Sequence, residues 1–525
     1  MSSTNKPMGF SMPMYRDIVP KAIRPWIYVL IALCFQLTGG VYLGSLNNMI
    51  GGNAVMREDI LMCMYATLCG MAIYFPILFR MKFRFTNKTL LLCSALTIAL
   101  CNYLSTVVDT LPLLWLVCFI SGCAKIQGTF ECMSNIQLWI SPKREFTVFF
   151  PVLHIIILSS IQISDIMAIW LSDIATWHYM HLLIIGIMLC ICMFISLFTK
   201  HVRIIKKMPL VGIDWLGAIL WAVISLCIAY LFNYGEWYNW WESRTVCNLT
   251  IIIILLIVAA LYRMNTIRHP YIEPAMWKYK HLPTILLLIG IVEAILASEH
   301  VLENIFYEDG MEYSEVTCSI LNIPTLTGIL IGCGFSLLWM KVLKLSYLRL
   351  IMVGLLAVST YIIMFYLTIS TDINIEKLYP IVGIRGFGYA VLSITFMTTL
   401  EEIMTFKHFF QSLSVFNMIH MLLGGVMGCA AYAFGIRYLV ADNISRIGLY
   451  IDNVNRDFNI SHNIAGIMTN IQMVSIKQLF GVVSFISLAM IIGAMLYDMP
   501  YTRSNLKRIP HWRPLGIKLR RESKH

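Results

Sequence analysis

The chain has 525 residues, of which 59% are hydrophobic and only 13% are charged, and its net charge is +11. Soluble proteins average about 45–50% apolar and about 25% charged residues, so this composition excludes a soluble enzyme, a disordered chain and a disulfide scaffold. A bilayer core of about 30 Å needs about 20 apolar residues per helix, and the apolar content suffices for at most roughly fifteen such helices. The composition therefore predicts an all-α polytopic membrane protein.

Fourteen apolar segments are long enough to cross a membrane. In chain order they cover residues 26–48, 59–79, 88–108, 112–139, 147–170, 178–199, 213–233, 246–262, 283–306, 316–340, 347–370, 378–400, 409–435 and 477–497. The first follows a polar N-terminal tail and has no small-residue cleavage site, so it is predicted to be a membrane span and not a signal peptide. An even number of spans places both termini on one side.

The positive charges of the loops give an orientation. With the N-terminus in the cytoplasm, the cytoplasmic loops and both tails hold 30 of the 39 Lys and Arg residues. Lys and Arg concentrate on the cytoplasmic side of membrane proteins, and a missed helix would reverse every later loop and remove this asymmetry. The charges therefore support fourteen spans with both termini cytoplasmic. On the other side, residues 437–476 are predicted to form a long polar periplasmic loop.

Five local segments carry distinctive motifs. They are the stretch GIDWLGAILWAVISLCIAYLFNYGEWYNWWES (212–243), HPYIEPAMWKYKHL (269–282), IRGFGYAVLSITFMTTL (384–400), QSLSVFNMIHMLLGGVMG (411–428) and TWHYMHLLIIGI (176–187). The first resembles the start of the two extra central helices in the fourteen-span drug:proton antiporters of the major facilitator superfamily. The others resemble that family's linker before the C-terminal bundle, its Arg-Gly helix, its penultimate helix and the entry to its sixth helix.

Other positions depart from the family's pattern. The loop PILFRMKFRFTNKTLL (76–91) is basic but lacks the family's Asp and Gly residues. The sequence SDIMAI (164–169) stands where the family has a Gly-Pro antiporter motif, and the first span carries Asn47 and Asn48 in place of an acid. The chain is identified as a divergent member of this family.

The resemblance implies a major facilitator fold of 14 transmembrane helices arranged as 6+2+6. Residues 1–207 would form an N-terminal six-helix bundle, residues 208–268 a two-helix central insertion, and residues 269–525 a C-terminal six-helix bundle with a basic cytoplasmic tail. Substrates of such folds bind near the midplane between the bundles. The implied location is the cell inner membrane.

The implied function is proton-coupled export of amphipathic small molecules or drugs by alternating access. A periplasmic adaptor and an outer-membrane channel are partners implied by the resemblance alone, beside membrane lipids. Two alternatives stay open: a membrane enzyme or lipid-linked glycan handling protein, and a carrier that is not coupled to protons. No phosphate-binding loop or HExxH motif is present, and the scattered cysteines indicate packing. We therefore expect no enzyme activity, cofactor, metal site or nucleic-acid partner.

Charged residues within spans are costly, so they are candidate functional sites. In the fourth span Gln127, Glu131 and Asn135 lie four residues apart and form one polar stripe on a helix. Lys125 lies 240° from Glu131 around the helix and needs a partner on another helix or in water. The stripe is interpreted either as a substrate or proton site, or as structural hydrogen bonding between helices.

The ninth span contains Glu293, Glu299, His300 and Glu303, which fall within a 120° arc of a regular α-helix. One polar face running from the midplane outwards resembles an access path, and a desolvated carboxyl can exchange protons near neutral pH. Glu293 is predicted to be either a coupling or substrate carboxylate or the partner of Lys125 in a permanent ion pair. Glu303 is predicted to be solvated at the membrane surface.

Two further charges complete the set of candidates. Asp165 lies in the outer third of the fifth span, where it either supplies an acid for coupling or lines the outer mouth. Arg385 matches the family's Arg-Gly pair in the twelfth span and is interpreted either as a substrate contact or as a helix-packing residue.

Overall fold

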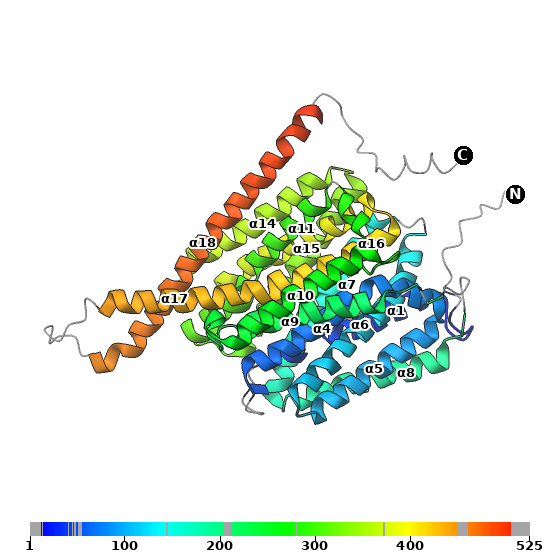
Figure 1. The fold of residues 1–525 in the computed structure, drawn as a ribbon, viewed down its shortest axis with the longest axis horizontal. Coiled ribbons are helices and arrows are strands. Elements are labelled where there is room, and N and C mark those ends of the chain that lie inside the picture. The colour runs from blue at the N-terminus through cyan, green and yellow to red at the C-terminus, as the bar shows by residue number, and fades with distance from the viewer. Residues whose placement is uncertain are drawn as a thin grey trace.

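A computed structural model gives the arrangement of the chain, which is helical throughout its described elements (Figure 1). It describes residues 12 and 14–505 except positions 40, 45, 47–48, 51–54, 143–144, 203–208, 211, 280, 371–372 and 449–459. Asn47, Asn48 and most of both tails lie outside these residues. In lipid every backbone polar group must be satisfied internally, which is why membrane-spanning segments with this apolar content form helices.

The N-terminal bundle follows the predicted order of spans. Its elements are α1 (Arg24–Leu37), α2 (Val41–Gly44), α4 (Arg57–Arg84), α5 (Asn87–Val107), α6 (Leu111–Ile140), α7 (Phe146–Ile174) and α8 (His178–Phe198). The first predicted span is not one helix, because α1 ends at Leu37 and the chain passes through Gly39 before α2 begins. The Thr38 hydroxyl and the Ser164 hydroxyl of α7 donate to the carbonyl oxygens of Phe35 and Leu37 at this break.

The central insertion consists of α9 (Trp215–Tyr234), a short turn η1 (Trp240–Glu242) and α10 (Arg244–Thr266). Helix α9 packs against α4 and against η7 of the C-terminal half. Helix α10 packs on α9 and buries only Val246, Ile253 and Ala260, one residue in seven, so its remaining surface suits contact with lipid. The pair therefore lies between the two bundles at the periphery (Figure 1).

The C-terminal bundle is more irregular. Its elements are η2 (Pro274–Lys278), α11 (Leu282–Leu296), η3 (Glu299–Glu303), η4 (Phe306–Gly310), α12 (Glu315–Ser319), α13 (Asn322–Leu337), η5 (Leu338–Val342), α14 (Tyr347–Thr368), η6 (Ile375–Leu378), α15 (Tyr379–Ile403), α16 (Phe406–Ile419), η7 (His420–Gly428), α17 (Cys429–Gly448) and α18 (Ile460–Asn505). Four of them are π-helical, namely η3, η4, η5 and η7. The π-helix is rare in proteins overall, but where it occurs it is often part of a functional site.

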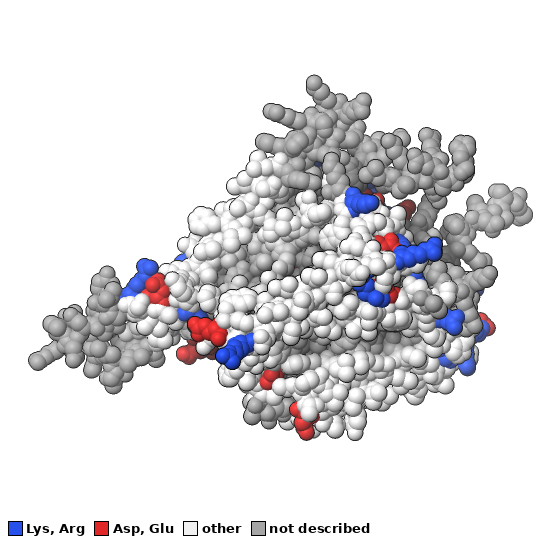
Figure 2. Space-filling model, viewed as in Figure 1, with Lys and Arg blue, Asp and Glu red and all other residues white. Residues whose placement is uncertain are grey.

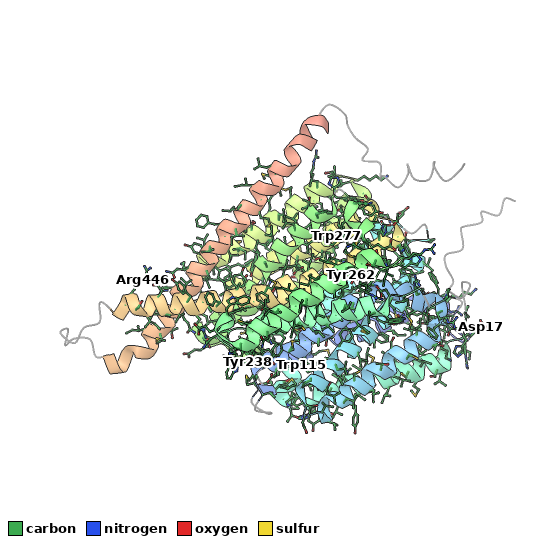
Figure 3. All side chains as sticks on the ribbon, in the orientation of Figure 1. Asp17, Trp115, Tyr238, Tyr262, Trp277 and Arg446 are labelled. Atoms are coloured by element: carbon green, nitrogen blue, oxygen red, sulfur yellow. The ribbon has the colours of Figure 1, made fainter. Side chains whose placement is uncertain are left out.

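Within the part of the chain that the structure describes, thirteen helices are long and apolar enough to cross a membrane, and α1 is a shorter apolar helix. We call the end where α1 begins the terminal end and the opposite end the distal end. Charged side chains gather at these two ends and leave a largely uncharged band between them (Figure 2). Tyr262 and Trp277 lie toward the terminal end and Trp115 and Tyr238 toward the distal end (Figure 3), as in interfacial aromatic belts. The chain is a multi-pass membrane protein.

The predicted long polar loop at 437–476 is largely helical. Helix α17 continues to Gly448 and α18 begins at Ile460, so the two form a hairpin that projects beyond the bundle (Figure 1). Asn443 of α17 donates hydrogen bonds to Ser475 (2.8 Å) and Gln478 (3.1 Å) of α18. These polar contacts between helices explain how a segment too polar for a membrane span still forms helix.

Glycines bring helix backbones into direct contact in both bundles. A Cβ added to Gly70 of α4 would lie 2.1 Å from the Phe119 carbonyl oxygen of α6, and one on Gly122 would lie 2.1 Å from that of Thr67. In the C-terminal bundle, a Cβ on Gly328 of α13 would lie 2.0 Å from a carbonyl oxygen of α15. Each bundle thus contains a pair of helices whose backbones are in close contact at glycines.

Asp214 ties the insertion to the rest of the protein at the terminal end. Its carboxylate accepts hydrogen bonds from Gly217 N (2.9 Å), from Arg263 Nη2 of α10 (2.7 Å) and from Tyr271 N in the following linker (3.2 Å). Burial acts to raise the pKa of Asp214, but these hydrogen bonds and the Arg263 charge outweigh burial and hold its pKa below the usual range.

We expect Asp214→Asn to destabilise the protein by about 1–3 kcal/mol at neutral pH, because hydrogen bonds to a charged group are lost. A carboxylate with a lowered pKa stabilises the fold above its unfolded pKa, and this contribution disappears as the pH falls through the folded value. The difference in melting temperature between wild type and variant in detergent should therefore stay constant down to about pH 4 and shrink below it. The control is Asp17→Asn: Asp17 forms a surface ion pair with Lys200, and its replacement should have no measurable effect. A difference that instead shrinks between pH 7 and pH 5 would contradict the assignment.

Candidate functional site

Lys125 is buried near the middle of α6, beside the break in the first span. Its Nζ would lie 2.2 Å from a Cβ placed on Gly39, so the absence of a side chain at Gly39 makes room for the ammonium group. The carboxylate of Asp165 on α7 attracts it electrostatically. The break at Gly39 thus places a cation at the C-terminal end of α1, where the helix dipole favours positive charge.

Arg385 of α15 holds two carboxylates in the distal half of the C-terminal bundle. Its guanidinium lies 2.8 Å from Glu299 Oε1 and 2.7 Å from Glu303 Oε2. Glu303 also accepts hydrogen bonds from the hydroxyls of Tyr307 and Tyr361. The prediction that Glu303 is solvated is wrong: only 2% of it is exposed, because Arg385, Tyr307 and Tyr361 enclose its carboxylate.

Charges from the two bundles face each other. The carboxylates of Asp165 in the N-terminal bundle and Glu299 in the C-terminal bundle repel one another, while Lys125 attracts Asp165. Helix α7, which carries Asp165, packs against α13 and α15 of the other bundle. The Trp170 indole of α7 also donates to the Ser319 hydroxyl of α12 at 3.1 Å. We call Lys125, Asp165, Glu299 and Arg385 the interbundle charge cluster.

Glu293 does not pair with Lys125 and does not share the surroundings of Glu299 and Glu303. Its Oε2 lies 2.9 Å from Nδ1 of His420, at the start of η7. The alternative of a Lys125–Glu293 ion pair is therefore wrong, and the single polar face expected for the ninth span is split in two. His300 is exposed at the same turn, on the side away from these ion pairs.

A small cavity adjoins Glu293. Its volume is about 10 Å³, and it is lined mainly by apolar and aromatic side chains. These are Ile289, Val292, Glu293, Tyr389, Leu392, Ser393, Phe396 and Phe416. A volume of this size is at the lower limit for one water molecule, so the cavity holds no organic substrate in this conformation.

Glu131 lies in the terminal half of α6 and is the centre of a separate polar cluster. Its carboxylate accepts hydrogen bonds from Asn87 Nδ2 (2.8 Å) and Gln127 Nε2 (3.2 Å), and its backbone carbonyl accepts from Asn135 Nδ2 (2.7 Å). The three residues of the predicted stripe on α6 are therefore hydrogen-bonded to one another. The cation nearest to Glu131 among the described ion pairs is Lys82 of α4, at 3.7 Å, which the sequence did not single out.

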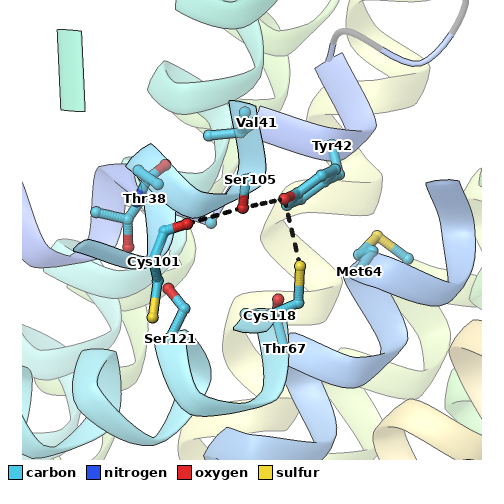
Figure 4. Close-up of a pocket in the computed structure, with 11 residues that line it drawn as sticks. Thr38, Val41, Tyr42, Met64, Thr67, Cys101, Ser105, Cys118 and Ser121 are labelled. Carbon is cyan, nitrogen blue, oxygen red and sulfur yellow. Dashed lines mark hydrogen bonds between the residues drawn. The ribbon is translucent and has the colours of Figure 1, made fainter. Parts of the chain in front are cut away.

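A second cavity, of about 20 Å³, lies within the N-terminal bundle beside Gly39 (Figure 4). The Tyr42 hydroxyl lies 2.9 Å from Ser105 Oγ and 3.3 Å from Cys118 Sγ at its wall. Its polar lining and volume fit about one water molecule.

Phenylalanines close the terminal end between the bundles. The ring of Phe79 on α4 lies with its centroid 5.0 Å from that of Phe130, 4.4 Å from that of Phe406 and 4.2 Å from that of Phe410. The first two residues belong to the N-terminal bundle and the last two to α16 of the C-terminal bundle. Sequence reasoning missed this cluster because isolated Phe residues in apolar helices carry no signal of which helices will meet.

The linker between α10 and α11 adds ionic contacts at the same end. Glu273 accepts hydrogen bonds from Lys407 and from His408 Nε2, which lies 3.0 Å away. Burial acts to raise the pKa of Glu273, but these hydrogen bonds and the neighbouring positive charges hold it below the usual range. The linker is thereby fixed to α16. Among the described residues no group of His, Cys, Asp and Glu is arranged to hold a metal ion.

No known protein-family profile and no curated protein matches this sequence. Its structure is similar to solved transporters at low sequence identity. A point mutant of the nucleoside transporter NupG superposes with a TM-score of 0.53 at 13% identity, covering 90% of this chain and 98% of that chain. The human organic anion transporter MFSD10 gives 0.54 at 10% identity, covering 91% and 100%. A variant of the peptide transporter POT in complex with alafosfalin gives 0.55 at 13% identity, covering 90% and 95%.

These similarities show the fold. The chain has the fold of the major facilitator transporters.

Proposed function

We propose that the chain is a proton-coupled secondary transporter that exports amphipathic small molecules or drugs by alternating access of its two bundles. The observation that carries the proposal is the interbundle charge cluster: Asp165, on the helix α7 that packs against α13 and α15 of the other bundle, lies within electrostatic range of Lys125 and of Glu299, whose carboxylate is paired with Arg385. A transporter of this kind needs a titratable group whose protonation changes the balance between two bundle arrangements.

Protonation of Asp165 is expected to shift the balance between the two bundle arrangements in one direction. A neutral Asp165 no longer repels Glu299, so proton binding favours an arrangement in which the distal halves of the bundles are in contact. Loss of the proton restores the repulsion and favours separation at that end. The loop charges predict that the distal end faces the periplasm. In that orientation, binding of a periplasmic proton to Asp165 closes the outer side and returns the empty carrier to its inward-facing state. This order is the one that an exporter driven by inward proton flow requires.

The other candidates have supporting roles in this proposal. Glu293 with His420, beside the apolar cavity, is proposed to bind substrate or a second proton, since Glu293 lies near the middle of the span Leu282–Gly310 and His420 near the middle of the α16–η7 helix. Arg385 is the ion-pair partner of Glu299. Glu131, Gln127 and Asn135 are already bonded to each other, and Lys82 lies close by, which favours a structural role.

The test is transport in proteoliposomes with an imposed pH gradient, using ethidium as a cationic probe and carboxyfluorescein as an anionic one. We expect Glu293→Gln to abolish proton-coupled efflux, and Asp165→Asn to leave downhill movement of the probe intact but remove its response to the pH gradient. Both variants should still be recovered as folded protein in the membrane. Glu242→Gln, in the exposed turn η1, is the matched control and should transport like wild type.

Unchanged pH-driven efflux in Glu293→Gln and Asp165→Asn would contradict the proposed coupling residues. Transport by the wild type that is insensitive to an uncoupler would favour the alternative of a carrier without proton coupling. A periplasmic adaptor and an outer-membrane channel belong to the proposal through the sequence resemblance alone.

A further inference from the structure

The contact between α4 and α16–η7 joins the two bundles along one seam. Helix α4 of the N-terminal bundle packs against α16 and η7 of the C-terminal bundle, and α9 covers α4 and η7 from outside. Any rocking of the bundles must open this seam at one end or the other. The hydrogen bonds that cross it therefore bear on which end opens.

Tyr271 crosses the seam in its terminal half. It belongs to the linker between α10 and α11, yet its side chain is buried between the bundles. Its hydroxyl donates to the Ile73 carbonyl of α4 at 2.7 Å and lies 2.8 Å from Ser414 Oγ of α16. Because the Tyr271 proton is directed to Ile73, Ser414 is the donor in the second contact. The hydroxyl is thus bonded to both bundles at once.

The backbone of Tyr271 is fixed from both sides as well. Its N–H donates to Asp214 Oδ2 of the insertion, and its carbonyl accepts from Gln411 Nε2 of α16 at 3.1 Å. The linker cannot withdraw the side chain without breaking these bonds.

Tyr65 makes the corresponding contact in the distal half of the seam. Its hydroxyl, on α4, donates to the Gly425 carbonyl of η7 at 2.8 Å. Tyr65 and Ile73 are eight residues apart on α4, or about 12 Å at 1.5 Å per residue. Each half of the seam therefore carries one tyrosine hydroxyl bonded to a backbone carbonyl of the opposite side.

We propose that Tyr271 and Tyr65 form two opposed latches, and that their relative strength sets the balance between the arrangement open at the terminal end and the one open at the distal end. Opening at the terminal end separates Ile73 from Ser414 and breaks the Tyr271 latch while the Tyr65 latch is retained. Opening at the distal end does the reverse. This inference rests on alternating access in the proposed function, but on neither its substrate nor its coupling to protons.

The experiment is hydrogen–deuterium exchange of the full chain in lipid nanodiscs. Tyr271→Phe keeps the ring and removes one hydroxyl, so exchange in the terminal segments 73–83 and 406–416 should rise roughly two- to tenfold, the range for one lost hydrogen bond. Tyr65→Phe should raise exchange in the distal segments 57–65 and 425–436 instead. Ser414→Ala, which removes only the α16 contact, should act like Tyr271→Phe but more weakly, and it supplies the test if Tyr271→Phe does not fold.

The matched control is Tyr313→Phe. The Tyr313 hydroxyl also donates to a backbone carbonyl at 2.7 Å, that of Ile373, but both residues belong to the C-terminal bundle. It should change exchange only around its own site. The inference is overturned if Tyr271→Phe and Tyr65→Phe raise exchange at the same end, or if neither changes either end. Because this readout needs no transport, it is independent of the fate of the proton-coupling proposal.

Discussion

Replacing Arg385 with glutamine should destabilise the folded protein by about 3–5 kcal/mol, the largest loss expected for any ion pair described above. Arg385 is the counter-charge of both Glu299 and Glu303, and its removal leaves Glu303 charged and buried in the bundle. The expected result is a strong fall in the melting temperature and yield of detergent-solubilised protein, measured by fluorescence-detected size-exclusion chromatography.

Two further variants test whether the loss of stability comes from breaking the ion pair or from mutation in general. The double variant Arg385→Gln/Glu303→Gln should regain much of the lost stability, because the uncompensated charge is removed with its partner. Arg437→Gln is the control: Arg437 Nη1 lies 2.7 Å from Glu236, the same separation as in the Arg385–Glu303 pair, but its side chain is 64% exposed. An exposed pair contributes about 0–1 kcal/mol, so a comparable loss in both variants would contradict the argument.

Gly328→Ala should prevent α13 and α15 from reaching their observed separation. The added methyl group would lie 2.0 Å from the Gly383 carbonyl oxygen and 2.8 Å from its carbonyl carbon. Backbone atoms cannot move aside as a flexible side chain can, so the two helices must separate. Overpacking typically costs about 1–3 kcal/mol, and we expect the upper part of this range or more. Thermal unfolding in detergent measures it.

Gly334 provides the control on the same helix. A Cβ at this position meets no atom within 4 Å. Gly334→Ala should therefore be neutral or stabilise the protein by up to about 1 kcal/mol through helix propensity. Equal destabilisation by the two alanines would show that the contact with Gly383 is not the cause.

The sequence predicted the parts of the fold that depend on one helix at a time. Span length identified almost every helix, including α9 and α10, whereas the orientation of the termini and the division into domains stay predictions. The stripe of Gln127, Glu131 and Asn135 was also correct, because residues four apart on a single α-helix must share a face.

Features that depend on departures from regular helix, or on two helices together, were not predictable. The 120° arc from Glu293 to Glu303 assumed 3.6 residues per turn, and the π-helical turn η3 changed that register. The position of the Lys125 side chain depends on the break at Gly39, which falls inside a segment predicted to be one continuous span. The seam tyrosines carried no signal either, since only the folded chain shows that Tyr271 of a linker enters the space between α4 and α16.

The length of one helix has a mechanical consequence. The segment from Phe406 to Ile447 is a continuous helical element of 42 residues, about 63 Å long and about twice the thickness of the bilayer core. The first half of this helix, α16 and η7, lies along the seam. The second half, α17, forms the projecting hairpin with α18. If the bundles pivot near the middle of the membrane, displacement grows with distance from the pivot, so the hairpin acts as a lever arm and its tip travels farther than any residue inside the lipid. A probe on this hairpin would therefore be the most sensitive external indicator of which way the carrier faces.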